Sequence, residues 1–100
     1  MEITTDVEGR KATLTLAGKL TVQTSSELNA TVEALPDRVC DVDIDLREVD
    51  YVSSAGLRVL IAADKLAARR GGRIRLLNPC DDVMSALEMT GLAEVFAIEQ

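Results

Sequence analysis

An alternation of apolar and acidic residues at positions 39–46 restricts the fold more than any other stretch of the chain. The two sets follow each other strictly, with apolar Val42, Ile44 and Leu46 set against acidic Asp41, Asp43 and Asp45. Successive side chains of a strand point to opposite faces, so the pattern predicts a strand with one buried and one polar face, ending near residue 46. The regular spacing of the aspartates is that of a polar strand face, and we do not assign them as metal ligands.

The N-terminal part of the chain predicts a hairpin followed by a helix. Alternating runs at residues 3–7 and 12–17 flank the turn residues 8–10, and the chain is expected to leave the second strand at residues 18–21. The segment Thr24-Ser25-Ser26-Glu27 fits a capping box, in which a hydroxyl and a carboxylate satisfy each other's backbone N–H groups. A helix is therefore predicted from this segment to Pro36, with Leu28, Val32 and Leu35 buried.

The C-terminal half predicts two further helices and two strands. A helix from about residue 54 to residue 70 has an apolar stripe, and Gly71-Gly72 ends it. A strand at 73–77, a helix opened by Asp81 or Asp82 and closed by Gly91, and a strand at 93–98 follow. The apolar residues of the two helices are Val59, Leu60, Ala63, Leu66 and Ala67 in the first, and Val83, Met84, Leu87 and Met89 in the second.

The resulting order, β-β-α-β-α-β-α-β, predicts an α/β fold with a mixed, mostly parallel sheet, because strands separated by helices favour parallel neighbours. The strands alternate instead of being apolar throughout, so the helices are expected on one face and the other face is expected to be open to water. If the third and fourth strands are neighbours, the aspartates lie beside Arg73 and Arg75. No repeat or linker interrupts residues 1–100, which we expect to form one domain.

Charge and composition exclude several classes of function. The net charge of −6 and an aromatic fraction of 2% argue against a nucleic-acid surface. The chain has no histidine, and Cys40 and Cys80 lack a CxxC spacing, so no zinc site or thiol–imidazole pair is expected. No phosphate-binding glycine motif is present, and we expect neither an enzyme nor a bound cofactor. Without an apolar run of about 18 residues or a signal-peptide pattern, we expect no membrane insertion and a cytoplasmic location.

Two adjacent serines, Ser53 and Ser54, precede the long helix. On residue types alone, Ser53 is the helix cap, Ser54 is the first helical residue, and Gly56 permits tight packing near the strand end. Alternatively, Ser54 is a modification site on the rim of the sheet. A helix start has unpaired N–H groups and the positive end of the dipole, so a phosphate there changes the surface without unfolding the domain.

Residues 50–60, Asp-Tyr-Val-Ser-Ser-Ala-Gly-Leu-Arg-Val-Leu, resemble the signature of STAS domains, specifically the stand-alone anti-sigma factor antagonists of bacteria. The resemblance extends over nearly the whole chain and implies the STAS fold. Its other landmarks are Gly18-Lys19-Leu20 with Thr24, Gly71-Gly72, Leu76-Leu77-Asn78-Pro79 and Thr90-Gly91-Leu92.

The resemblance implies a regulator in a partner-switching system, not an enzyme. The unphosphorylated protein would bind an anti-sigma factor that is also a serine kinase, phosphorylation would release it, and a PP2C-type phosphatase would reset it. ATP and magnesium would belong to the kinase. The phosphorylated serine of the family falls on Ser54, with Ser53 as a secondary acceptor. The implied docking face comprises Gly18, Lys19, Leu20, Thr21, Ser53, Ser54, Gly56, Leu57, Arg58 and Ile61.

Two positions depart from the family's pattern. Many members have an aspartate at the position of Ser53 and often another at that of Thr21. Arg58, four residues after Ser54, either braces a phosphate, meets an acidic partner or is a solvated helix charge. Leu57 and Ile61 are either core residues or an interface patch. The alternative function is a STAS scaffold or accessory subunit of a transport, lipid-trafficking or signalling complex that phosphorylation does not control.

Overall fold

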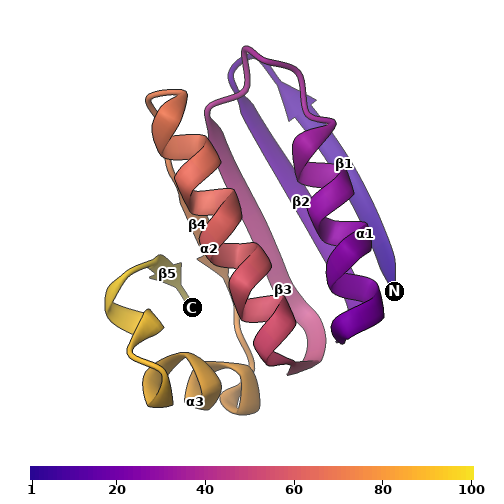
Figure 1. The fold of residues 1–100 in the computed structure, drawn as a ribbon, viewed down its shortest axis with the longest axis vertical. Helices are drawn as coiled ribbons and strands as arrows, with labels where there is room; N and C mark the ends of the chain where they lie inside the picture. Colours follow the sequence, from indigo (N-terminus) through magenta and orange to yellow (C-terminus); the bar gives the residue numbers. More distant parts are fainter.

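The computed structural model describes all 100 residues, and five strands form one sheet in the order β1-β2-β3-β4-β5 (Figure 1). Strands β1 (Glu2–Glu8) and β2 (Lys11–Leu20) pair antiparallel as the predicted hairpin. Strands β3 (Asp41–Val52), β4 (Ile74–Leu77) and β5 (Ala97–Glu99) continue the sheet, and each is parallel to its preceding neighbour. The prediction of a mixed, mostly parallel sheet is confirmed.

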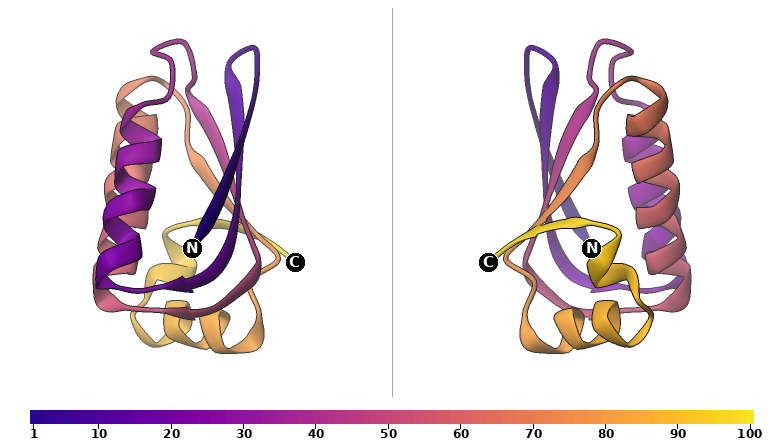
Figure 2. Two further views of the ribbon diagram at one scale, coloured as in Figure 1. Left: turned by 90° about the vertical axis from the view of Figure 1, so that its right-hand side faces the viewer. Right: turned by 90° about the vertical axis from the view of Figure 1, so that its left-hand side faces the viewer.

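Helices α1 (Val22–Glu33) and α2 (Ser54–Arg69) lie side by side and cover one face of the sheet (Figure 2). Helix α3 (Asp81–Met89) instead lies at the end of the sheet where α2 begins, and a 3-10 helix, η1 (Leu92–Glu94), leads from it towards β5. None of the helices is long and apolar enough to cross a bilayer.

The hydrophobic core lies between the sheet and helices α1 and α2, where the predicted apolar faces meet. The strands bury the residues predicted to face inwards, and both long helices contribute their stripes to the same layer. The largest fully buried side chains include Leu14, Leu16, Leu28, Ile44, Leu46, Leu60, Ile74 and Leu76. Leu57 is buried as well, and Ile61 packs against the core from its margin, which favours core packing over an interface patch for these two residues.

The junction between β2 and α1 differs from the prediction. Residues 18–20 stay in β2 because they pair with the end of β3, and α1 starts at Val22, before the segment proposed as its cap. The cap is Thr21, whose hydroxyl accepts the backbone N–H of Thr24 at 3.2 Å. In return, the hydroxyl of Thr24 accepts the N–H of Thr21 at 2.7 Å. The capping box therefore exists one turn earlier than predicted, with threonine in the role assigned to Glu27.

Strand β3 also exceeds its predicted end near residue 46, and it runs directly into the serines without a turn. Two register shifts against β2 let the pairing continue, so that Lys19 lies opposite Tyr51 and Leu20 lies opposite Val52. Parallel pairing with β2 decides this length, since the composition of residues 47–50 does not mark a strand.

The last predicted strand, 93–98, is wrong in its first half. Gly91 adopts a left-handed conformation with φ of 78°, and the next residues form η1. Strand β5 has three residues, paired with Arg75, Leu76 and Leu77 of the short strand β4.

Candidate functional site

The connections β2–α1 and β3–α2 lie next to each other at the carboxyl ends of the parallel strands. The backbone N–H of Ser53 donates a hydrogen bond to the carbonyl oxygen of Leu20 at 2.8 Å, which ties the two connections together. Because β2 and β3 are neighbours and run parallel, α1 and α2 both start from this edge. In parallel sheets, this edge is where ligands and partners commonly bind.

The two serines have different roles at the start of α2. Ser53 is the N-cap, and its Oγ accepts the backbone N–H of Gly56 at 3.1 Å. It is half-buried, whereas Ser54 is the first helical residue and is exposed. The predicted assignment of cap and first helical residue is confirmed. Of the two hydroxyls, that of Ser54 is more accessible and takes no part in capping the helix.

Gly56 brings the start of α2 against the strand ends. A Cβ atom at this position would lie 2.8 Å from Cγ and Cδ2 of Leu20 and 3.0 Å from Cγ2 of Val52. Ordinary van der Waals contact between carbon atoms needs about 3.5–4.0 Å, so a side chain here would force Leu20, Val52 or the start of α2 to move. This agrees with the predicted tight packing.

Thr21 and Ser53, the two positions that depart from the family's usual aspartates, are the N-caps of α1 and α2. Serine, threonine and aspartate all cap helices well, because each offers a side-chain oxygen to a free backbone N–H. Threonine and serine at these positions therefore keep both caps. This edge has two fewer negative charges than it would have with aspartates there. The first turns of α1 and α2 contain no acidic residue.

Asp50 and Arg58 are the charged residues closest to the serines along the chain, and Lys19 precedes Leu20, to which Ser53 is hydrogen-bonded. Nζ of Lys19 lies 3.2 Å from Oδ1 of Asp50, in an exposed ion pair. Arg58 is exposed and has no ion pair within the chain. The site thus offers one engaged and one free cation beside an exposed hydroxyl.

The docking residues implied by the resemblance fall into three groups by exposure. Those exposed to solvent are Gly18, Lys19, Ser54 and Arg58. The half-buried ones are Thr21, Ser53 and Ile61. The buried ones are Leu20, Gly56 and Leu57, which belong to the core and support the face from below.

Two exposed apolar residues at this edge were missing from the prediction. Val22, the first residue of α1, is 65% exposed, and Tyr51, near the end of β3, is 48% exposed. Their exposure depends on where α1 starts and β3 ends, and both boundaries were misplaced. In the sequence, the only indication of these two positions was that both are apolar and lie close to residues of the implied docking face.

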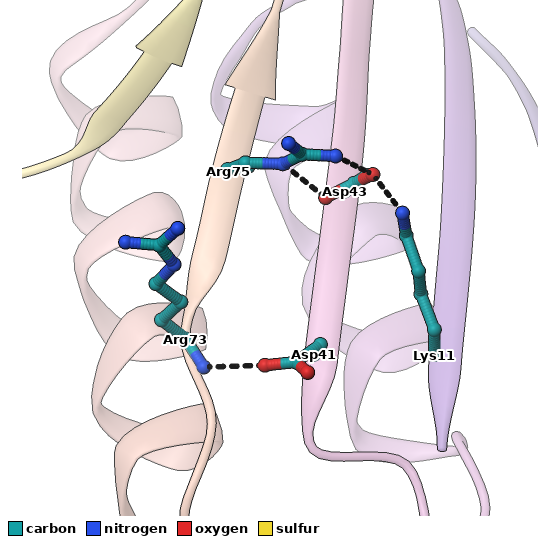
Figure 3. A pocket seen from close by; sticks show the side chains of 5 residues that line it. All are labelled: Lys11, Asp41, Asp43, Arg73 and Arg75. Atoms are coloured by element: carbon teal, nitrogen blue, oxygen red, sulfur yellow. Dashed lines mark hydrogen bonds and ion pairs between the residues drawn. The ribbon is translucent and has the colours of Figure 1, made fainter. Parts of the chain in front are cut away.

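A second polar feature, a shallow depression of about 230 Å³, lies on the face of the sheet away from α1 and α2 (Figure 3). Asp43 occupies its centre, with Oδ2 2.8 Å from Nζ of Lys11 and 2.7 Å from Nη2 of Arg75. Arg75 also pairs with Glu99, while the backbone N–H of Arg73 donates to Oδ1 of Asp41. The predicted pairing of aspartates with arginines is confirmed for Asp43 and Arg75, whereas Arg73 contributes its backbone.

Asp43 is only 5% exposed, so this face is less open than predicted. The hydrogen bond from Arg75 holds the pKa of the Asp43 carboxyl below its usual value, against the opposing effect of burial. The same contact raises the pKa of Arg75. Both groups stay charged and satisfy each other, which identifies the depression as a structural ion-pair network. No group of three or more His, Cys, Asp or Glu side chains is arranged to hold a metal ion.

The family model described as "Mlab, STAS domain" matches residues 3–98. The chain is a STAS domain. This establishes the family that the signature at residues 50–60 suggested, and the observed order of strands and helices agrees with it.

Similar proteins are named as antagonists of anti-sigma factors. The anti-sigma-B factor antagonist of Bacillus subtilis (strain 168) is 27% identical over 100 residues, which cover 98% of this chain and 92% of that protein. An anti-sigma factor antagonist from Mycobacterium paratuberculosis has the same fold, with a TM-score of 0.85, 19% identity and coverage of 98% of this chain and 84% of that one.

The antagonist SpoIIAA is known in unphosphorylated and phosphorylated forms, and both share this fold. The TM-score is 0.77 for each, at 17% and 16% identity, over 99% of this STAS domain and 89% and 92% of those chains. The names of these relatives describe antagonists of anti-sigma factors, and none describes an enzyme.

Proposed function

We propose that this STAS domain is an anti-sigma factor antagonist that binds an anti-sigma factor with serine kinase activity and is released when Ser54 is phosphorylated. The observation that carries the proposal is the exposed hydroxyl of Ser54 at the start of α2, in a chain similar to named antagonists. A PP2C-type phosphatase resets the protein, and the exchange takes place in the cytoplasm. The STAS domain is itself no enzyme in this scheme.

Phosphorylation at Ser54 changes the surface more than the fold. A phosphate adds roughly −1.5 to −2 charges, next to the free N–H groups and the positive dipole end of α2. The cap survives, since Ser53 and not Ser54 accepts the N–H of Gly56. A partner that covers this edge must desolvate or repel the new charge, which costs several kcal/mol.

The geometry favours Ser54 over Ser53 as the acceptor. The Ser53 hydroxyl is half-buried and already accepts a backbone N–H, so a kinase reaches it less readily. Ser53 stays in the proposal as the secondary acceptor. In this proposal, the docking face consists of the exposed residues around Ser54, and the exposure of Val22 and Tyr51 supports including them.

The test is incubation of the protein with its cognate kinase and ATP, followed by mass-spectrometric mapping of phosphate. We expect phosphate on Ser54. The Ser54→Ala variant should stay bound to the kinase, and Ser54→Asp should keep its melting temperature but bind at least tenfold more weakly, equivalent to about 1.4 kcal/mol. Thr5→Asp, at an exposed threonine of β1 outside the proposed docking face, is the control and should bind normally.

Absence of phosphate from both Ser53 and Ser54 would overturn the proposal. Stable co-purification with a partner, whether or not Ser54 is modified, would instead support the scaffold or accessory-subunit alternative.

A further inference from the structure

We propose that Arg58 is the intramolecular partner of a phosphate on Ser54, so that phosphorylation withdraws a cation from the docking face while it adds an anion. The inference rests on the proposed function, because it assumes that Ser54 is modified. It gives Arg58, four positions after Ser54, a role in binding the phosphate within the chain.

The first support is the position of Arg58 on α2. Residues four apart on a helix are surface neighbours, with Cβ atoms about 5–6 Å apart. Helical side chains lean towards the N-terminus, so a long side chain at position 58 can reach over the turn that begins with Ser54. Both residues are exposed, and an acid placed before a base at this spacing is the favourable orientation.

The second support is that nothing else in the chain engages Arg58. It has no ion pair, and the helical neighbours at its other i±3 and i±4 positions are Ala55, Ile61 and Ala62, none of which is charged. Lys19, the other cation at this edge, is already paired with Asp50. A phosphate on Ser54 would therefore find a free guanidinium within one helical turn.

The third support is chemical. A guanidinium presents its donors in a planar fork that binds two phosphate oxygens at once, which an ammonium does not. In the unmodified protein, Arg58 is free to meet an acidic group of the partner. After modification, its donors are engaged by the phosphate, and the docking face loses that contact as well as gaining negative charge.

The experiment uses the full chain with phosphoserine encoded at position 54, so that no kinase is needed. Titration followed by phosphorus NMR measures the second ionisation of the phosphate, which a nearby cation makes more acidic. We expect Arg58→Gln to weaken this acidity by about 1.5- to 2-fold at low salt, in line with an exposed helical ion pair. Arg58→Lys should restore part of it, and the difference should shrink at high salt.

Arg69→Gln is the matched control, because Arg69 is an exposed arginine of the same helix and lies about 22 Å along the axis from Ser54. It should leave the phosphate titration unchanged. Equal titration curves for the parent protein and Arg58→Gln would overturn the inference and leave the proposed function intact. A kinase that fails to modify Ser54 would overturn the proposed function without affecting this measurement.

Discussion

Asp43 is a charged side chain whose environment is decided by its neighbours in the sheet. It is buried between Lys11 and Arg75, which come from the strands on either side of β3. A buried carboxylate is stable only while it is paired and hydrogen-bonded, since taking it out of water is costly. The lowered pKa of Asp43 reflects the hydrogen bond from Arg75, which prevails over the opposing effect of burial.

Asp43→Asn should lower the free energy of unfolding by about 2 kcal/mol near neutral pH, because Lys11 and Arg75 lose their shared acceptor. The pKa of Asp43 is lower in the folded than in the unfolded protein. Its contribution is therefore complete above the unfolded value of about 3.9 and is lost as the pH falls through the folded value.

Urea denaturation of both proteins between about pH 7 and pH 2 measures this difference. The difference in the free energy of unfolding between the parent and Asp43→Asn should become smaller at the acid end of this range. Asp6→Asn, at an exposed aspartate of β1 without an ion pair, should have little effect at any pH. Equal stabilities of the parent and Asp43→Asn at neutral pH would contradict the prediction.

At the scale of elements, α1 and α2 start in the same way and at the same edge of the sheet. Each has a hydroxyl residue as its N-cap, Thr21 or Ser53, directly after a strand. Ser54 lies one position inside α2, where its side chain is not needed for the cap. Because Ser53 supplies the cap, the proposed modification of Ser54 should leave the helix in place.

Ser53→Ala should therefore destabilise the protein by about 1 kcal/mol, because the N–H of Gly56 loses its acceptor. Ser53→Asp should restore most of this stability, and Ser54→Ala should change it by less than about 0.5 kcal/mol. Thermal denaturation of the three variants measures these differences in stability. A Ser54→Ala protein less stable than Ser53→Ala would show that the roles of the two serines are reversed.

At the scale of the whole molecule, the ion-pair network and the proposed switch lie near opposite ends of β3. Asp43 and Ser53 are ten residues apart along an extended strand, which corresponds to about 30 Å. The molecule itself measures 33 Å along its longest axis. Modification of Ser54 is therefore expected to alter partner binding without reaching the network that stabilises the far end.

Stability effects at the two ends should consequently add. The double variant Asp43→Asn/Ser54→Asp should be destabilised by the sum of the single effects, within about 0.5 kcal/mol. Chemical denaturation of the four proteins in this cycle is the measurement. A larger deviation would mean that the charge at position 54 alters the packing of the entire sheet, and the switch would then act through the fold.

Much of the fold was predictable because its signals are local. The alternation around Asp43 separates the two faces of β3, and the spacing from Leu60 to Ala67 identifies the buried stripe of α2. The order of cap and first helical residue at Ser53 and Ser54 was also correct, since capping depends on neighbouring backbone groups. Proposing Ser54 as the phosphorylation site, by contrast, rested on the resemblance to the family.

Element boundaries and exposure depended on contacts between distant segments. Strands β2 and β3 are longer than predicted because they pair with each other, and β5 is shorter than predicted, with three residues paired to β4. Position 72 requires glycine because a Cβ atom there would collide with the backbone of Cys40. No residue near Gly72 in the sequence indicates this contact.

The amino-acid sequence by itself determined which faces are apolar, where the long helix begins and which residue types lie at its start, because these properties follow from the periodicity of strands and helices. Only the tertiary structure decided that Asp43, Leu20 and Leu57 are buried and that Arg58 is exposed without an ion pair. The physical reason is that burial and ion pairing depend on which side chains from other strands and helices surround a residue.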